Sequence, residues 1–190
     1  MDYSVLVKSA RQKPKEETTK HKVMIPVKIK LNGGIMPKKA HRSDAAFDLY
    51  VPEEVVLQYG RQIVDLKFSI ELPMGYAATI QPRSGFSSKG IEVEEHFDPF
   101  GQGADVSTTR IDGDVLRGLV DAGYRGSVGV ILNIQSLGMP FDEDSRWVLK
   151  KGTRIAQMQI IEVPQVELIE AEELSDTDRG EGGFGHIGTK

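Results

Sequence analysis

The chain has 190 residues, enough for one domain with a substantial core, and its mild net charge of -4 implies no strongly basic face for direct binding of nucleic acid. The absence of cysteine excludes disulfides, thiolate metal sites and thiol nucleophiles, and it fits a reducing compartment. No apolar segment approaches the length of a membrane span and no secretory h-region is visible, so we expect no membrane association and a cytoplasmic location.

The N-terminal part of the sequence predicts a loose extension before the ordered domain. Residues 8–22 are polar and rich in lysine without a hydrophobic period, although the pattern allows a short strand at Tyr3–Val7. Order is expected from residue 23, because Val23–Ile29 alternates between apolar and polar residues as a strand does. We therefore assign residues 1–22 to a partly disordered extension.

Short strand candidates recur along the rest of the chain, and Gly, Pro, Asn and Asp separate them. The further predicted strands are Phe47–Val51, Glu54–Leu57, Gln62–Ile70, Tyr76–Gln81, Val115–Val120, Ser127–Ile134, Arg146–Leu149 and Arg154–Val163. Only Ser84–Lys89 suggests a helical turn. Many short strands with this spacing are typical of an all-β barrel or jelly roll rather than an α/β sheet.

One long polar segment interrupts this rhythm inside the predicted domain. Glu92–Asp112 reads as a connection without strand character. A connection of that length in a compact domain is usually an added structure or a functional one, so this insertion is a candidate surface for a protein partner.

The C-terminal segment differs in composition from everything before it. Glu167–Asp178 is strongly acidic, and Arg179–Gly188 carries five glycines around Phe184. The predicted organisation is therefore a barrel over residues 23–166, with the insertion at about 92–112, followed by an acidic linker and arm over residues 167–190.

The segment Pro82–Gly90 leaves a predicted strand and opens the helical turn. Backbone N–H groups at such a start bind anions, and Gly85 lets a ligand approach the backbone. Arg83 adds a planar guanidinium that suits phosphate oxygens. A plain β-turn with a surface ion pair would carry the same residues, so this segment alone leaves both interpretations open.

A glutamine in the last predicted strand needs a hydrogen-bond partner, because its neighbours are apolar. Alternation would place Gln157 and Ile155 on one face of this strand, with Arg154, Ala156 and Met158 on the other. The partner of Gln157 is then either a backbone carbonyl or a ligand oxygen.

Two further segments allow a functional interpretation beside a plain one. The glycine-rich end is either a disordered tail or a lid that places Arg179 on phosphate and Phe184 on a base. Asp48 either caps a turn, as most such aspartates do, or helps to hold Mg²⁺, which accepts few protein carboxylates. The four histidines show no ligand spacing and do not predict a structural zinc site.

The most informative stretch of the sequence is Leu119–Gly126. An apolar run delivers Asp121 to a tight turn, Tyr124 follows three residues later, and a second apolar strand begins beyond the turn. An aspartate in a turn commonly bonds to its own backbone. The other segments that suit phosphate favour a functional carboxylate here.

Together, these segments resemble the five motifs of the trimeric deoxyuridine triphosphatase (dUTPase) family. The matching motifs are Ala45–Leu49, Pro82–Gly90, Gly118–Gly129, Gly152–Gln157 and Arg179–Gly185. Any one of them is weak, whereas five in the same order are specific. The resemblance covers nearly everything from residue 23 to residue 188.

The resemblance implies a jelly-roll-like β-barrel that assembles as a homotrimer. The implied reaction is hydrolysis of dUTP to dUMP and pyrophosphate with Mg²⁺ held mainly by the triphosphate, which limits uracil incorporation into DNA and supplies the precursor of dTMP. Asp121 would position and activate the water that attacks the α-phosphorus. Asp48 would contact the Mg²⁺ through water.

The family also implies how each active site is assembled. One chain would supply Asp48, Arg83, Ser84 and Gln157, a second the Asp121 hairpin, and a third the glycine-rich arm. The implied substrate-binding residues are Arg83, Ser84, Gly85, Leu119, Val120, Tyr124, Gly129, Gln157, Arg179, Phe184 and Gly185. Among these, Tyr124 would lie under the deoxyribose and exclude a 2′-hydroxyl, backbone groups near Gly129 would read the uracil edge, and Phe184 would cover the base.

Three other functions compete with this interpretation. A dCTP deaminase of the same fold needs a glutamate in the strand after the turn, where Ile131 stands here. A non-catalytic or dual-role nucleotide-binding protein would use the insertion as its partner surface. A structural jelly-roll subunit would use the arm only to tie protomers together. His186 and Ile187 replace the small hydroxylated pair that follows Phe-Gly in the family, so hydroxyl contacts from that pair are lost.

Overall fold

The computed structural model describes residues 24–97, 105–136 and 146–182, and almost all regular structure in these ranges is β. The one helix found there is α1 (Ser84–Lys89). The strands are β1 (Lys28–Leu31), β2 (Phe47–Tyr50), β3 (Val55–Val56), β4 (Gly60–Asp65), β5 (Phe68–Glu71), β6 (Tyr76–Gln81), β7 (Ile91–Phe97), β8 (Asp105–Leu116), β9 (Gly118–Asp121), β10 (Gly129–Ser136), β11 (Arg146–Leu149) and β12 (Arg154–Glu162). Among the residues described, no helix has the length and apolar character needed to cross a membrane.

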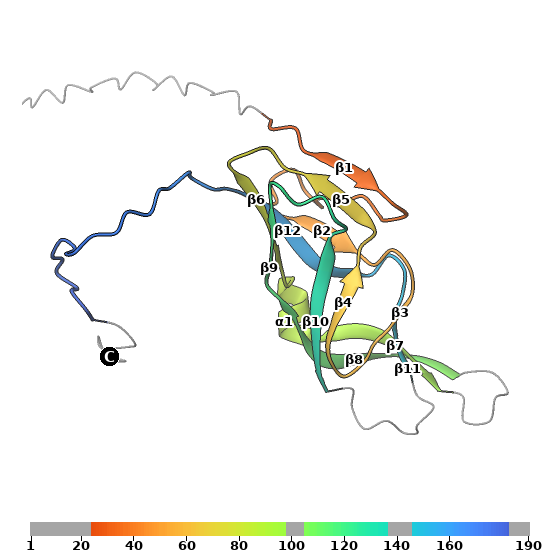
Figure 1. The fold of residues 1–190 in the computed structure, drawn as a ribbon. Coiled ribbons are helices and arrows are strands. Elements are labelled where there is room, and N and C mark those ends of the chain that lie inside the picture. The colour runs from red at the N-terminus through yellow and green to blue at the C-terminus, as the bar shows by residue number, and fades with distance from the viewer. Residues whose placement is uncertain (1–23, 98–104, 137–145, 183–190) are drawn as a thin grey trace, which may run out of the picture.

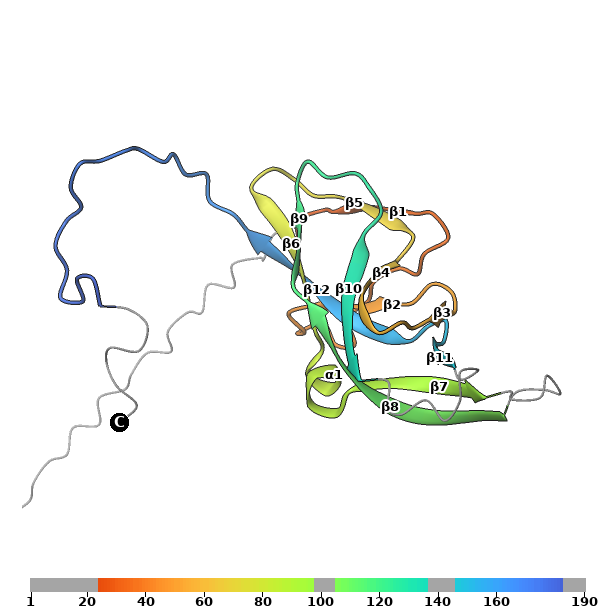
Figure 2. The ribbon, with the colours of Figure 1, turned by 60° about the horizontal axis from the view of Figure 1, so that its bottom comes forward.

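The strands form three antiparallel sheets. The largest has the order β3-β11-β7-β8-β10-β4, the second has the order β2-β12-β6-β9, and β1 pairs with β5. Figures 1 and 2 show the sheets curving around a common interior, with α1 at one end. This arrangement is a nearly closed barrel, and it confirms the predicted all-β, jelly-roll-like fold.

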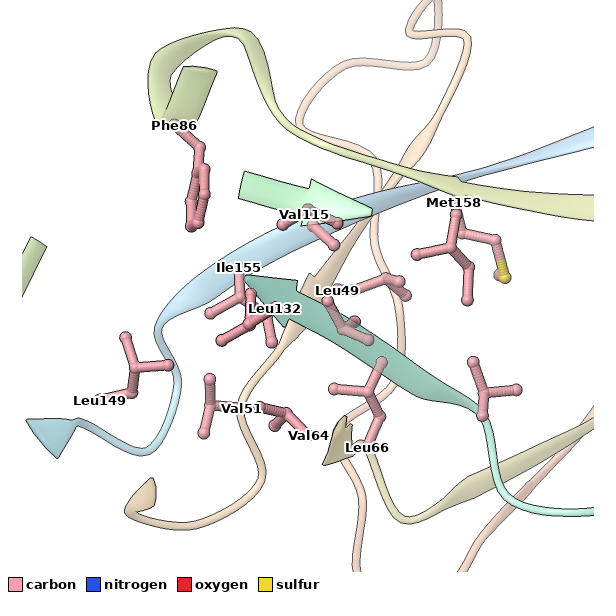
Figure 3. Close-up of a cluster of buried hydrophobic side chains, with 14 of the residues drawn as sticks. Leu49, Val51, Val64, Leu66, Phe86, Val115, Leu132, Leu149, Ile155 and Met158 are labelled. Carbon is pink, nitrogen blue, oxygen red and sulfur yellow. The ribbon is translucent and has the colours of Figure 1, made fainter. Parts of the chain in front are cut away.

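The core is filled by aliphatic side chains from both large sheets (Figure 3). Leu49 and Ile155 from the four-stranded sheet and Leu132 and Leu149 from the six-stranded sheet are fully buried. Each such side chain stabilises the fold by about 1.5–3 kcal/mol relative to an exposed one. Phe86 anchors α1 to the same core. The strands that carry the candidate site therefore rest on a rigid interior.

Most predicted elements are found where the pattern places them. The structure has α1, β6 and β11 at the predicted bounds, and β2, β3, β10 and β12 within two residues of them. The first predicted strand begins late, at Lys28 instead of Val23. Its partner β5 ends at Glu71, opposite Lys28, and continued pairing would bring Pro26 opposite Pro73, which both lack an N–H.

The predicted strand Gln62–Ile70 is wrong as a single element, because a turn divides it into β4 and β5. Lys67 in this turn has φ of 54°, which strands do not allow. Its N–H donates to Oδ1 of Asp65 at 2.9 Å, and its carbonyl accepts from the N–H of Asn32 at 2.8 Å. These local hydrogen bonds stabilise a turn in a stretch whose apolar pattern is typical of a strand.

The predicted strand Val115–Val120 is divided at Arg117. β8 ends at Leu116 in the six-stranded sheet, and β9 begins at Gly118 in the four-stranded sheet. The chain therefore passes from one sheet to the other at this point. This crossing places the end of β9, which carries Asp121, at the edge of the four-stranded sheet.

The insertion Glu92–Asp112 is not the long connection that its polarity suggests. It contains most of β7 and β8, which pair from Ile91 opposite Ile111 to Phe97 opposite Asp105. Val93 and Ile111 are buried in the core. Charged and hydroxyl side chains on the other positions of these strands hide the alternation. The short strand predicted at Tyr3–Val7 lies outside the described residues.

Candidate active site

The first half of the candidate site is a pocket beside the turn between β9 and β10, named the hairpin pocket after the hairpin expected from the sequence. The expected hairpin is wrong as a pairing, because β9 and β10 belong to different sheets. This pocket has a volume of about 210 Å³. Its lining includes the residues predicted to contact water, sugar and base, which are Leu119, Val120, Asp121, Tyr124 and Gly129. The structure thus brings these five residues together around one hollow.

Asp121 is the last residue of β9, and its Cα partner is Ala77 on β6. Its carbonyl accepts the N–H of Tyr124 at 3.0 Å, which closes the turn. Asp121 is exposed, whereas the preceding Val120 is buried and fixes the strand. A carboxylate that stands on a fixed strand end and faces solvent is placed to orient a water molecule.

The Tyr124 side chain is tied to the turn through its hydroxyl, and the backbone beside it is held separately. Its hydroxyl donates to the carbonyl of Ser127 at 2.9 Å. Nη1 of Arg125 donates to the carbonyls of Ala122 at 2.6 Å and of Tyr124 at 2.8 Å, which holds the backbone of the turn. The ring is 45% exposed and lines the hairpin pocket, so a ligand can reach it.

The turn is anchored to the neighbouring strands by Ser127 and Val128. The hydroxyl of Ser127 donates to Oδ1 of Asp65, and the N–H of Val128 donates to the carbonyl of Phe68 at 2.8 Å. The hydrogen bond from Ser127, followed by that from the N–H of Lys67, holds the pKa of Asp65 below its usual value of 3.8. Contacts with the β4–β5 turn therefore set the position of the hairpin pocket.

The second half of the candidate site is a phosphate pocket of about 390 Å³, lined by residues of β2, β6, α1 and β12. Its lining includes the residues Asp48, Arg83, Ser84, Gly85, Arg154 and Gln157. All the phosphate contacts predicted for the barrel are among them, together with the predicted metal contact Asp48.

The start of α1 leaves open space over Gly85. Arg83 precedes the helix with φ of -82° and ψ of 144°, and its carbonyl accepts the N–H groups of Phe86 and Ser87, both at 3.0 Å. The N–H groups before these have no carbonyl within the helix to reach. A Cβ atom added at Gly85 would meet no heavy atom within 4 Å. Packing in this chain therefore does not require glycine here, whereas close approach of a ligand would.

Asp48 holds two arginines at the phosphate pocket. Its Oδ1 accepts from Nε of Arg83 at 2.8 Å, and its Oδ2 lies 3.3 Å from Nη1 of Arg154. The pocket lining carries these two guanidinium groups and two carboxylates, Asp44 and Asp48. Asp48 holds both guanidinium groups at the pocket, where they can form charge-assisted hydrogen bonds to phosphate oxygens. Arg154 is the residue that the sequence interpretation missed. The one available signal was an arginine at the start of the strand that carries Gln157.

Gln157 finds the more common of its two predicted partners. Its Nε2 donates to the carbonyl of Pro82 at 2.9 Å, so it links β12 to the segment that leads into α1. The amide also lines the phosphate pocket. This hydrogen bond holds the side chain in place beside Arg83.

The predicted alternation of faces along β12 is wrong at its start. Arg154 pairs with Tyr50 and Ala156 pairs with Leu49, so Ile155 is an extra residue in a β-bulge. Ile155 and Ala156 are consequently both buried, while Arg154 points to the exposed pocket. A bulge breaks the two-residue period on which the prediction depended.

The hairpin pocket and the phosphate pocket share no residue. Strand β6 lies between β9 and β12. Its residue Ala77 pairs with Asp121 of β9, and its residue Gln81 pairs with Gln157 of β12. Four residues along a strand correspond to roughly 13 Å. Within a single chain, Asp121 and Gln157 are therefore too far apart to contact the same phosphate group.

The described part of the arm, residues 167–182, lines neither pocket of its own chain. Residues 163–181 are exposed throughout, and they run away from the barrel after β12 (Figures 1 and 2). Arg179 makes only a local contact there, from its Nε to the carbonyl of Gly182 at 2.8 Å. Phe184 and Gly185 lie outside the described residues, so their predicted roles stay predictions.

Comparison with known proteins identifies a family for this chain. The dUTPase family model matches residues 32–103 and 107–188. Curated relatives include the deoxyuridine 5′-triphosphate nucleotidohydrolases of Hydrogenobaculum sp. and Thermobifida fusca. The first is 36% identical over 158 residues, which cover 82% of this chain and 91% of that protein. The second is 38% identical over 155 residues, which cover 80% and 72%.

Solved structures show the same likeness. The dUTPase of Staphylococcus bacteriophage 80alpha, solved with dUPNHPP, superposes with a TM-score of 0.67 at 26% sequence identity. The match covers 87% of this chain and 99% of the bacteriophage chain.

Proposed function

Because this chain belongs to the dUTPase family, we propose that it is a dUTP diphosphatase, which hydrolyses dUTP to dUMP and pyrophosphate. The observation that carries the proposal is the content of the two pockets. One gathers the groups suited to a base, a sugar and a water molecule, and the other gathers cations and a helix start. A nucleoside triphosphate needs both sets. By this reaction the protein would limit uracil incorporation into DNA and supply the precursor of dTMP.

We assign base recognition to the backbone of the hairpin pocket. Backbone groups of Leu119, Val120 and Gly129 would pair with the uracil edge, and a cytosine in their place would leave buried polar groups unpaired. A Cβ atom at Gly129 would lie 2.9 Å from Cγ2 of Ile63, so packing keeps the backbone bare at this point. The rival deaminase needs a glutamate in this pocket, where Ile131 offers no carboxylate.

Asp121 is the group that we assign to the chemical step. Its carboxylate would orient a water molecule and accept a proton as the water oxygen bonds to the α-phosphorus. The bond from the α-phosphorus to the bridging oxygen breaks, and pyrophosphate leaves with the bond's electron pair. Phosphoryl transfer depends mostly on alignment and charge stabilisation, so one positioned carboxylate and several cations suffice on the protein side.

The phosphate pocket would hold the triphosphate and, through it, Mg²⁺. We assign phosphate contacts to Arg83, Ser84, Gly85 and Gln157, with Arg179 added by the arm. No group of three potential metal ligands is found among the residues that the structure describes, which fits a Mg²⁺ ion held mainly by the triphosphate. The Asp48 oxygens, each with one arginine partner, retain a lone pair for a water of that ion. The metal would supply charge neutralisation on the phosphates.

The separation of the two pockets supports a homotrimer with shared sites. We propose that the hairpin pocket of one subunit faces the phosphate pocket of the next. Large apolar side chains are exposed where such contacts would form, among them Leu119 of the hairpin, which is 63% exposed. Val166 at the end of the barrel domain is also exposed, as are Leu168, Ile169 and Leu174 in the segment that follows.

The arm would act as a lid on a site of another subunit. We propose that residues 23–166 form the barrel domain and that residues 167–190 form a linker and lid, after an extension over residues 1–22. The lid would bring Arg179 to the phosphates and Phe184 and Gly185 to the base and phosphates, and it would exclude water. We also propose a cytoplasmic location, which the absence of cysteine fits. We further propose that residues 92–112 contact a protein partner.

A pyrophosphate-release assay with Mg²⁺ and dUTP, dTTP, dCTP or UTP tests this function. We expect rapid release from dUTP alone. Comparable release from dCTP would contradict the substrate assignment, and no release from dUTP would contradict the activity itself.

A further inference from the structure

Two glycines flank Tyr124 in the β9–β10 turn, and their surroundings differ. Neither Gly123 nor Gly126 has a positive φ, so neither is required by the backbone conformation. A Cβ atom at Gly123 would meet nothing within 4 Å. Only Gly126 is therefore under a steric constraint, and that constraint comes from a side chain.

The constraint at Gly126 is the Tyr124 ring itself. An added Cβ atom would lie 2.6 Å from Cζ and 3.0 Å from Cε2 of Tyr124, and closer still to its hydroxyl oxygen. Real Cβ contacts essentially never fall below 3.0 Å. The missing side chain at position 126 is therefore what allows the ring to lie against the turn.

The same position of the ring allows its hydrogen bond. The Tyr124 hydroxyl reaches the Ser127 carbonyl at 2.9 Å by passing over Gly126. A methyl group at position 126 would push the ring away and break this bond. Since the ring is half-exposed and its backbone is held separately by Arg125, the ring would move and the turn would stay.

We infer that Gly126 is a positioning residue that sets sugar specificity through Tyr124. The inference rests on the proposed function and on the place that the family resemblance implies for Tyr124, with its ring under the deoxyribose. A ring fixed by Gly126 and Ser127 leaves no space and no partner for a 2′-hydroxyl, which would be desolvated without a hydrogen bond. A ring that is free to shift would accept that hydroxyl, so discrimination between dUTP and UTP would fall.

The test compares Gly126→Ala with the matched control Gly123→Ala in the Mg²⁺-supplemented full-length enzyme. The readout is the ratio of kcat/KM for dUTP to kcat/KM for UTP. We expect Gly126→Ala to lower this ratio about tenfold, mainly through a higher kcat/KM for UTP, because a ring that can shift accepts the 2′-hydroxyl. Gly123→Ala should keep the wild-type ratio. An unchanged ratio in Gly126→Ala, or an equal loss in both variants, would overturn the inference.

A double-mutant cycle separates positioning of the ring from general damage to the turn. In a Tyr124→Ala background, Gly126→Ala should cause no further change in the ratio, because no ring remains to displace. A further loss of similar size would overturn the inference. If the Gly126→Ala protein does not fold, the same ratio is measured for Tyr124→Phe, which lacks the hydroxyl that bonds to Ser127. Loss of the bond to Ser127 should lower the ratio severalfold, and an unchanged ratio would overturn the inference.

Measurements on the wild-type protein distinguish failure of the proposed function from failure of this inference. Wild-type protein that does not hydrolyse dUTP would overturn both. Wild-type protein that hydrolyses dUTP, together with a Gly126→Ala variant of unchanged selectivity, would overturn only the role of Gly126.

Discussion

Arg83 and Asp48 form a partly buried ion pair, in which Nε donates to Oδ1 at 2.8 Å and the side chains are 28% and 14% exposed. The bond uses Nε of Arg83 and leaves its terminal nitrogens for other partners. Arg154 approaches the second oxygen of Asp48 at 3.3 Å. One carboxylate thus fixes two cations before any ligand arrives, which is the kind of preorganisation that electrostatic stabilisation of phosphate requires.

Replacement of Arg154 tests whether the second cation contributes to substrate binding. We expect Arg154→Gln to raise the KM for dUTP about tenfold while kcat changes less, because a charge-assisted contact to phosphate is lost. Arg110→Gln is the matched control. Arg110 is exposed to a similar degree, and its ion pair with Glu92 lies on the β7–β8 hairpin. Equal KM values in the two variants would exclude a role for Arg154 in binding.

Replacement of Asp121 tests the assignment of the chemical step. Asp121→Asn keeps the shape of the side chain but cannot accept the proton of the water. We expect kcat to fall by about two orders of magnitude or more, with little change in KM or in thermal stability. Asp114→Asn is the control, because that carboxylate accepts a hydrogen bond from Gln135 on the neighbouring strand and lines neither pocket. Turnover within a few-fold of wild type in Asp121→Asn would refute the assignment.

Removal of residues 179–190 tests the lid. The barrel should stay folded, because residues 179–181 are exposed and do not belong to the hydrophobic core. Turnover should fall nearly to zero, because Arg179 and the aromatic cover are lost. Fluorescence of Trp147, the one tryptophan, reports folding, and pyrophosphate release reports activity. Full activity of the truncated protein would show that no lid is needed.

The hydrogen bond between Ser127 and Asp65 predicts a pH-dependent contribution to stability. The pKa of Asp65 is lowered in the folded state, so its contribution is present above the unfolded value of 3.8 and is lost as the pH falls through the lowered value. We expect Ser127→Ala to lower the free energy of unfolding by about 0.5 kcal/mol at neutral pH, because the pair is exposed and solvent screens it.

Between neutral pH and a pH well below 3.8 this difference should shrink, because Asp65 becomes protonated as the pH falls through its lowered pKa. Urea unfolding of wild type and Ser127→Ala at the two pH values measures it. Ser107→Ala, at an exposed position of β8, controls for loss of a surface hydroxyl. A difference of the same size at both pH values would mean that ionisation of Asp65 is not involved.

Local patterns were sufficient to predict most strands, but not the events that depend on contacts across the fold. The apolar residues of Tyr76–Gln81 predicted the strand, and the glycine-containing turn that follows it predicted the short helix Ser84–Lys89. The turn at Lys67 was not predictable, because hydrogen bonds to Asp65 and from Asn32 decide it. Charge on the outer positions of β7 and β8 concealed their pairing in the same way.

The candidate site shows the same division. The phosphate pocket joins residues of three separate motifs, whereas the predicted residues of the hairpin pocket come from one motif. All the predicted residues of the barrel fall in one pocket or the other. Arg154 could not be predicted, because the bulge at Ile155 turns it toward Asp48 against the expected alternation. The sequence also does not reveal that Asp48 bonds to arginines. An aspartate that binds arginine side chains and one that binds a metal-bound water look the same in a sequence.

The hairpin in the six-stranded sheet also changes how the insertion can be studied. Deletion of residues 92–112 would remove Val93 and Ile111 from the core, so loss of activity in such a variant would report unfolding. Substitutions at exposed positions of β8, such as Val106, avoid this problem.

The central claim is that Asp121 of one subunit acts on a phosphate held by Arg83 of another, and complementation tests it directly. Asp121→Asn and Arg83→Gln are each expected to be inactive. Co-expressed, they should recover about one quarter of wild-type activity, because three of four randomly mixed trimers contain both variants and each of these has one intact site in three. Activity no higher than that of the separate variants would contradict the shared site.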